Sequence, residues 1–263
     1  MQHVPTKEVE SLTEFLSILT GLQRAIGGNL WFRGVKDKNF QLVPGLYRPG
    51  VLAAESSFVS AFLVGYKAYV ADTPDNPWDL YSLMQHHGLP TRLLDWSRSP
   101  LHALFFSLQE PEEEAMDCAV WAMHPHELNL LTLGTEPLYC PGGLASRVIQ
   151  LPTGLFNLDS YLPEALDALD HFNLPKHPIA IEARYTNSRI RSQLGCFTLH
   201  GSGSAPLESW FPDDSRYLFR LVVNAEHRLD FLEDLYVLGV NEETIYQDLD
   251  SLVARVRRER IRG

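Results

Sequence analysis

The stretch Gln85-His86-His87-Gly88-Leu89-Pro90-Thr91-Arg92-Leu93-Leu94-Asp95-Trp96 brings a helix end, a turn and a strand together. Gly88-Leu89-Pro90 is expected to end a helix over residues 78–87, because glycine and proline both interrupt helical hydrogen bonding. Residues 91–96 then predict a turn and a short strand. The polar and charged side chains gathered here are the first candidates for a functional site.

A buried helix is predicted directly after this stretch. Ser99 is a good N-cap residue, and Pro100 suits the first helical position. Residues 101–108 are apolar on nearly every side, which indicates a buried helix. If Ser99 is the cap, the hydroxyl of Ser97 is left free for another role.

Outward from this centre, the periodicity of apolar residues predicts interspersed strands and helices. The absence of a regular strand–helix–strand rhythm favours an α+β fold, with one domain over residues 1–263 and a mixed or antiparallel sheet split by helices. The expected helices cover residues 10–26, 51–70, 78–87, 100–108, 225–238 and 248–260, with short helices near 126–131 and 162–172 and either a helix or a bridging loop at 188–193. The expected strands cover residues 30–33, 91–96, 118–123, 179–185, 196–200 and 217–223, and Gly34 is expected to end the first.

Composition and charge exclude several classes of protein. The 263 residues carry a formal net charge of −11, so a general coating of nucleic acid is not expected, although a local basic groove is compatible with it. No apolar run is long enough to span a membrane, and no secretory signal is evident. The three cysteines Cys118, Cys140 and Cys196 are far apart, which favours a reduced cytoplasmic protein. Five arginines at 255–262 are interpreted as the solvated end of a C-terminal helix.

Five segments, in order, resemble the bacterial FRG-domain family. They are Trp31-Phe32-Arg33-Gly34, Leu42 to Arg48, Gln85 to Phe106, Gln193 to Thr198, and Leu238 to Leu249. The third segment is the longest and most specific. In the fifth, Tyr246 and Gln247 replace the family's usual phenylalanine and proline. The resemblance extends over residues 28–256, which we take as the core, and it leaves the activity open because the family's activity is not well defined.

A second resemblance suggests a reaction. Mono-ADP-ribosyltransferases of the arginine–serine–glutamate class carry an arginine on an early strand, where Arg33 lies here. Their serine strand leads into a helix with alanine and phenylalanine at fixed offsets, and Ala103 and Phe106 follow Ser97 at similar offsets. The segment that corresponds to the transferase glutamate runs from Arg189 to Phe197 and holds no glutamate. Gln193 is its nearest polar candidate.

This resemblance implies an NAD-dependent ADP-ribosyltransferase-like enzyme that transfers ADP-ribose to a protein, RNA or DNA, with NAD as substrate and no metal. It also implies a setting in bacterial stress or antiphage defence, as a toxin or effector, with an antitoxin or regulatory protein as partner and no membrane. Arg33 would bind the pyrophosphate, since its planar fork is bidentate. Ser97 and His86 would line the nicotinamide side. Gln193, or a carboxylate not yet placed, would stabilise the ribosyl cation.

Further candidates for cofactor binding belong to the same motifs, and each also has a structural interpretation. They are Gly34, Arg48, Gln85, His87, Thr91, Arg92 and Asp95. Arg92 and Asp95 could form a local ion pair that fixes the turn. His86 and His87 could transfer protons, or could be favoured by the helix dipole alone. Arg33 could instead bond loop carbonyls, and Gln193 could pair with the backbone.

Two functions of other classes remain open. The chain could be a non-catalytic nucleotide- or nucleic-acid-binding module that uses the same arginines and histidines, which the missing glutamate favours. It could also be a metal-independent nuclease that uses His86 or His87 with Arg92. His124 and His126 lie near Cys118 but lack a second pair of ligands, so no metal site is predicted. No phosphate-binding glycine loop and no hydrolase elbow is present.

Overall fold

The computed structural model describes residues 4–70, 73–74, 76–109, 116–142, 148–152, 154–166, 174–184, 188–213 and 215–261. Within these residues the chain forms a seven-stranded sheet in the order β1-β9-β4-β2-β3-β8-β7. β1 and β9 are parallel, and the other neighbours are antiparallel. The expected α+β fold with a mixed sheet is therefore confirmed. The strands are β1 (Thr6–Val9), β2 (Trp31–Val35), β3 (Leu93–Ser97), β4 (Cys118–Met123), β7 (Ile179–Ile181), β8 (Gly195–Leu199) and β9 (Leu218–Val223).

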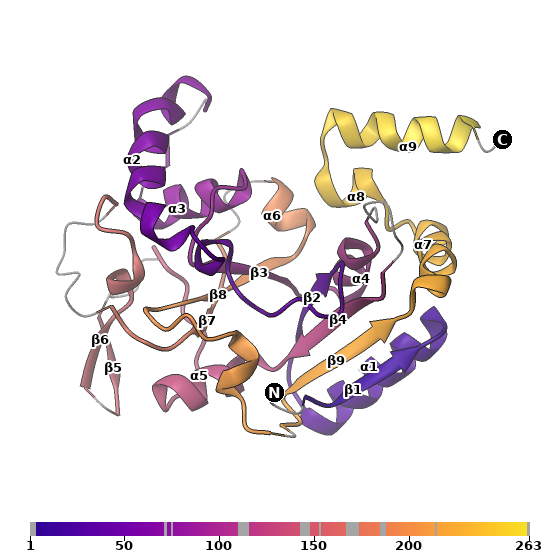
Figure 1. Cartoon of the computed structure of the whole chain (residues 1–263), viewed down its shortest axis with the longest axis horizontal. Coiled ribbons are helices and arrows are strands. Elements are labelled where there is room, and N and C mark those ends of the chain that lie inside the picture. Colours follow the sequence, from indigo (N-terminus) through magenta and orange to yellow (C-terminus); the bar gives the residue numbers. More distant parts are fainter. Residues whose placement is uncertain are drawn as a thin grey trace.

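Helices pack on both faces of the sheet, and α2, α3, α6, α8 and α9 lie above it in the view of Figure 1. They are α1 (Leu12–Ile26), α2 (Glu55–Gly65), α3 (Pro77–His86), α4 (Pro100–Leu108), α5 (Pro125–Leu133), α6 (Ser188–Ser192), α7 (Arg228–Val237), α8 (Glu242–Tyr246) and α9 (Leu249–Ile261). Short 3-10 helices cover residues 45–47, 52–54, 66–68, 158–161, 207–210 and 225–227. A separate hairpin joins β5 (Val148–Leu151) to β6 (Gly154–Asn157). No helix in the described part of the chain is long and apolar enough to cross a membrane.

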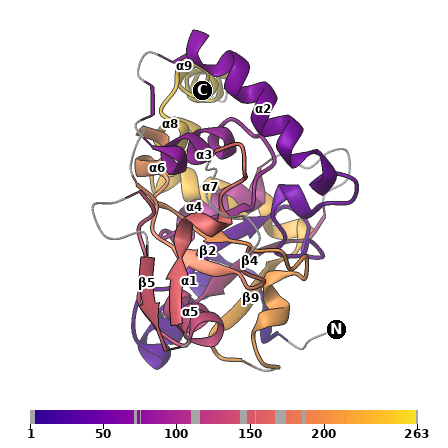
Figure 2. The same cartoon turned by 90° about the vertical axis from the view of Figure 1, so that its left-hand side faces the viewer.

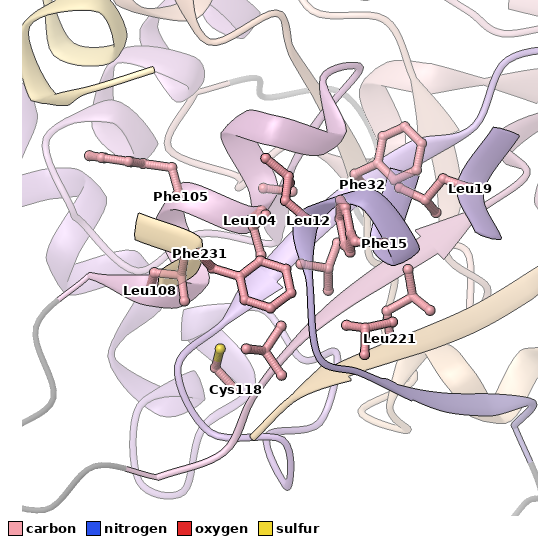
Figure 3. Close-up of a cluster of buried hydrophobic side chains, with 14 of the residues drawn as sticks. Leu12, Phe15, Leu19, Phe32, Leu104, Phe105, Leu108, Cys118, Leu221 and Phe231 are labelled. Carbon is pink, nitrogen blue, oxygen red and sulfur yellow. The ribbon is translucent and has the colours of Figure 1, made fainter. Parts of the chain in front are cut away.

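One buried cluster joins α1, α4 and α7 to the sheet (Figure 3). Phe15 of α1 meets Phe231 of α7 edge to face, with ring centroids 6.5 Å apart. Leu104 of α4 is completely buried in the same cluster. Because offset and edge-on aromatic pairs add to the energy of apolar burial, this cluster is a main source of stability for this face of the sheet.

The contact between α4 and β2 depends on Gly34. A Cβ atom on this residue would lie 1.9 Å from the carbonyl oxygen of Ala103 and 2.7 Å from the amide nitrogen of Ser107. The helix backbone thus rests directly on the strand backbone, which only a residue without a side chain permits. Gly34 was expected to end the strand, but β2 continues through it to Val35. The glycine is needed for close packing and not for a turn.

Serine side chains cap the first turns of two helices, and the cap predicted at Ser99 is confirmed. Ser11 accepts a hydrogen bond from the amide of Glu14 and begins α1. Ser99 accepts one from the amide of His102 and begins α4, with Pro100 at its first position. These caps satisfy amides that have no partner within their helices.

Several elements differ from the expected ones. The helix expected over 51–70 is a 3-10 turn, α2 and a second 3-10 turn. The strand expected over 179–185 stops at Ile181, and residues 162–166 of the helix expected over 162–172 form turns, while 167–172 lie outside the described residues. β1, the β5–β6 hairpin and α8 were not predicted. Each is short, and β1 is stabilised by pairing with β9 far along the chain, so local periodicity carries little trace of it.

The C-terminal helix α9 turns its polar side toward the protein. Arg255 and Arg258 form ion pairs with Glu243 and Glu242 of α8, and the Arg258 guanidinium lies 3.6 Å above the ring of Tyr236. The interpretation of the arginine run as a solvated helix end is therefore wrong for these two residues. They fasten α9 to α8, and through Tyr236 to α7, because arginine can pair with a carboxylate and stack on an aromatic ring at once.

Candidate functional site

A cavity of about 300 Å³ lies where β2, β3 and β8 meet α3 and α6. Both views show α3 and α6 beside this part of the sheet (Figures 1 and 2). Seven residues singled out from the sequence line the cavity: Arg33, Gly34, Gln85, His86, Asp95, Ser97 and Gln193. The other lining residues are Phe32, Ser82, Trp96, Phe106, Arg189, Ile190, Gly195 and Phe197. Apolar walls with a few convergent polar groups are typical of a small-molecule site.

Strand pairing places Arg33 and Asp95 against each other. β2 pairs with β3 where Phe32 lies opposite Ser97. From the next position, the Nη1 atom of Arg33 donates a 2.6 Å hydrogen bond to the backbone carbonyl of Asp95. The guanidinium thus bonds a carbonyl of β3, and not the loop carbonyls of its alternative interpretation, and it also lines the cavity. Desolvation lowers the pKa of Arg33, and the negative charge of Asp95 opposes this shift.

The Asp95 carboxylate faces the cavity and is held from the side of α3. Gln85 Nε2 donates a 2.6 Å hydrogen bond to Asp95 Oδ2. The buried hydroxyl of Thr91 donates to Gln85 Oε1, which fixes the orientation of that amide. Desolvation by the surrounding walls raises the pKa of Asp95, while Arg33 and the Gln85 hydrogen bond lower it. Thr91 does not line the cavity, so its role is to position Gln85.

Arg92 does not pair with Asp95, so the predicted ion pair within the turn is wrong. The Arg92 guanidinium instead pairs with Glu55 of α2 through two hydrogen bonds. The Tyr81 hydroxyl accepts a hydrogen bond from the backbone amide of Arg92. The reason is strand geometry. Residues three apart in an extended segment point to opposite faces, and the backbone at Arg92 already bonds to His200 beyond the end of β8.

His86 and His87 separate into different environments. His86 is half-buried and lines the cavity, and desolvation lowers its pKa to about 4, with smaller contributions from the charges of Arg189 and His87. Its imidazole is therefore neutral at neutral pH. His87 is exposed, lies outside the cavity and meets the His86 ring edge to face. Arg48 is exposed and does not line the cavity either.

The Ser97 hydroxyl is not free, although Ser99 does cap α4. It donates a 2.7 Å hydrogen bond to the carbonyl of Gln193 and accepts one from the amide of Ser99. Ser97 therefore joins β3 to the residue that follows α6 and fixes Gln193 at the cavity. The Gln193 Nε2 atom is buried and has no hydrogen-bond partner among the described residues. Because leaving such a donor unpaired costs free energy, a ligand acceptor is the natural partner.

Two polar residues of the cavity were missed from the sequence, Arg189 and Ser82. Arg189 precedes Gln193 by four positions, and its carbonyl accepts the Gln193 amide. Helical spacing therefore places both residues on one face, and this signal could have revealed Arg189 once Gln193 was a candidate. Ser82 carried no such signal, because a serine inside a helix is ordinary. Its hydroxyl, like the Gln193 amide, is buried without a partner in the described part of the chain.

The histidines near Cys118 have structural partners. His124 Nδ1 accepts the amide of Glu127 and caps α5, and His126 Nδ1 is bonded to the carbonyl of Glu136. Among the described residues, no three histidine, cysteine or acidic side chains come together as a metal site. The three cysteines are free thiols, two of them buried.

The comparisons with known proteins bear on one part of this site. Residues 28–116 match the family model of the FRG domain. The match includes the first three of the five segments that resemble the family, among them the Phe32-Arg33-Gly34 motif and the stretch from Gln85 to Ser97. The fourth and fifth segments, Gln193 to Thr198 and Leu238 to Leu249, lie outside it. The match ends before β4, so Arg189 and Gln193 lie outside the FRG match. Neither the curated proteins nor the solved structures gave a match.

The buried side chain of His200 predicts that the stability of the protein falls at acid pH. Burial lowers the pKa of His200 from 6.5 to about 3, with a smaller contribution from Arg33. Between these two pH values the unfolded chain binds a proton that the folded chain excludes, so the free energy of unfolding falls as the pH falls. Denaturant unfolding over a pH series should show a shallower slope for His200→Gln than for the wild type. The exposed His87→Gln is the control, and an unchanged slope in His200→Gln would contradict the prediction.

Proposed function

We propose that the cavity binds NAD and cleaves its nicotinamide–ribose bond, and that the chain is an ADP-ribosyltransferase-like enzyme. The observation that supports this most is the convergence of Arg33, Asp95 and Gln193 on one cavity from three separate segments. Asp95 is then a candidate for the carboxylate that would stabilise the ribosyl cation, since the sequence alone named no carboxylate for this role. A cavity at the small end of the range for ligand sites suits one portion of a dinucleotide.

The reaction needs little from the protein beyond charge and position. The C1′–N bond breaks, its electron pair goes to the ring nitrogen, and neutral nicotinamide leaves. Water or an acceptor nucleophile then bonds to C1′ and gives up a proton. Because positive charge develops on the ribose, a carboxylate fixed nearby stabilises the transition state. Asp95 supplies this charge, Gln85 holds it in place, and Arg33 favours its ionised form.

The remaining polar groups have compatible roles. Neutral His86 can accept a proton from the attacking nucleophile, since its lone pair is not blocked by a proton at neutral pH. The unpaired Gln193 amide can donate to a ligand oxygen. We place the activity in bacterial stress or antiphage defence, with a protein, RNA or DNA as acceptor and a regulatory partner that controls it.

A second candidate is a nucleotide-binding module without catalysis. No glutamate is among the lining residues, and Asp95 already interacts with Gln85 and Arg33. A metal-independent nuclease built on Arg92 has less support, because the Arg92 guanidinium is engaged by Glu55 and does not line the cavity.

The test is incubation with NAD labelled in its adenosine half, together with protein, RNA or DNA as acceptor, while nicotinamide release is measured. Wild type should release nicotinamide. Arg33→Ala should release at least about a hundredfold less, because without the positive charge of Arg33 the ionised form of Asp95 is no longer favoured. Arg24→Ala, an exposed arginine of α1, is the matched control. No release by the wild type, combined with a raised melting temperature in NAD, would replace the enzyme by the binding module.

A further inference from the structure

Arg189 occupies an unusual position in the cavity. It projects from the five-residue α6, and its guanidinium carbon lies 4.8 Å from the centre of the Tyr246 ring on α8. The two elements are also joined by a 2.8 Å hydrogen bond from Ser192 Oγ to the carbonyl of Ile245. The Tyr246 ring can stack on the flat face of the guanidinium. The N–H groups of the guanidinium point outward in its plane, so they remain free to donate hydrogen bonds to a ligand.

In the part of the chain that the structure describes, the charge of Arg189 is not balanced by an ion pair. Elsewhere in the protein, Arg92, Arg98 and Arg184 pair with Glu55, Glu182 and Asp79. Among the described residues no carboxylate lies within ion-pair distance of Arg189. Its charge acts from a longer distance on His86, Asp95 and Asp248 and contributes a lowering to the pKa of each, although desolvation leaves the pKa of Asp95 raised. Arg33 likewise has no ion pair among the described residues, but its guanidinium donates to the Asp95 carbonyl, and its charge lowers the pKa of Asp95 more than the charge of Arg189 does.

Two donors without acceptors line the same cavity. Gln193 Nε2 and Ser82 Oγ are buried and have no hydrogen-bond partner in the described part of the chain. A cation without an ion-pair partner among the described residues, together with unpaired donors, is satisfied by a ligand that is negatively charged and rich in acceptor oxygens. A phosphate group has both properties.

We propose that Arg189, held on the Tyr246 ring, is the phosphate-binding residue of the cavity, and that the ligand is a phosphorylated nucleoside. Arg33 is then the positioning residue of Asp95 and not the ligand of the pyrophosphate, as the sequence alone had suggested. The proposal rests on the proposed function for the choice of nicotinamide nucleosides as probes. The requirement for a phosphate rests on Arg189, Gln193 and Ser82 alone.

The experiment compares two probes that differ by one phosphate, nicotinamide mononucleotide and nicotinamide riboside, by calorimetry. Wild type should bind the mononucleotide more tightly. Arg189→Gln should weaken this binding about tenfold or more while affinity for the riboside stays the same, since a charge-assisted bidentate contact is lost. Arg191→Gln, an exposed arginine of the same helix, is the matched control and should bind both probes like the wild type.

Variants of Tyr246 test the support of Arg189. Tyr246→Phe keeps the aromatic face and should preserve the preference for the mononucleotide, whereas Tyr246→Leu should reduce it. If Arg189→Gln melts at a much lower temperature than the wild type, Arg189→Lys keeps the charge without the planar fork, and it should retain part of the preference.

The outcomes separate this inference from the proposed function. Equal losses for both probes in Arg189→Gln, an unchanged affinity for the mononucleotide, or no preference in the wild type would each overturn the role of Arg189. Nicotinamide release from NAD could still be observed in that case. Conversely, a wild type that prefers the mononucleotide through Arg189 but never cleaves NAD would support this inference and remove the proposed enzyme activity.

Discussion

Gly34→Ala is expected to destabilise the protein by about 3 kcal/mol or more, because the new methyl group would overlap the backbone of α4. The nearest atom is the Ala103 carbonyl oxygen, 1.9 Å from the position of the added carbon. Backbone cannot swing aside as a flexible side chain can, so α4 must move away from β2. That movement also disturbs the buried cluster around Leu104 (Figure 3). Chemical denaturation measures the loss directly.

The control is another glycine that has space around it. A Cβ atom at Gly21 in α1 would meet nothing within 4 Å. Gly21→Ala should therefore leave the protein as stable as the wild type or stabilise it by about 0.5–1 kcal/mol, since alanine favours the helix. If Gly34→Ala were as stable as Gly21→Ala, the close contact between α4 and β2 would be absent in solution.

Asp95→Asn should have the largest effect on activity, reducing nicotinamide release from NAD by roughly 10²- to 10³-fold, the usual loss when a fixed electrostatic contact to the transition state is removed. The amide has nearly the same shape as the carboxylate, so Gln85 can keep its hydrogen bond. The substitution removes the negative charge that, in the proposed reaction, stabilises the ribosyl cation and interacts with Arg33. The measurement is single-turnover release of nicotinamide at a fixed NAD concentration.

Asp234→Asn on the exposed side of α7 is a suitable control, because it removes the same charge at a residue that does not line the cavity. Its rate should equal that of the wild type. The pH dependence adds a second readout. Since desolvation raises the pKa of Asp95, wild-type activity should fall as the pH drops through that raised value. Asp95→Asn should lose this part of the acid limb and keep only the fall caused by protonation of His86, whose pKa is about 4. A variant as active as the wild type would exclude Asp95 from the chemistry.

Local signals in the sequence predicted the elements that depend on local physics. The Ser99-Pro100 pair predicted the start of α4, and short, mostly apolar segments predicted β4 and β9. Gly34 shows where such signals are insufficient. A glycine after Phe32-Arg33 looks like a strand end, and only the position of α4 reveals that close packing requires it.

The candidate site was predictable to the extent that its residues belong to recognisable motifs. Arg33, Ser97 and Gln193 do line one cavity. The partners of other charged residues at and near the site could not be predicted, because they come from distant segments. Glu55 pairs with Arg92 across 37 positions, and Tyr246 supports Arg189 from another helix. Neither contact leaves a trace in the periodicity of either segment, so no local rule could have replaced the mistaken pair of Arg92 and Asp95.

The position of β3 inside the sheet, between β2 and β8, has a consequence for the order of assembly. Its second neighbour is β8, and the Trp96–Thr198 contact between them joins residues 102 positions apart. The partner of β1, β9, is synthesised even later, since the Arg220–Thr6 contact between them spans 214 positions. During synthesis, the outer edge of β3 therefore stays unpaired until β8 has emerged from the ribosome, and such edges invite aggregation. The cavity does not exist on the nascent chain before that moment, since Gln193 and Arg189 arrive only just ahead of β8.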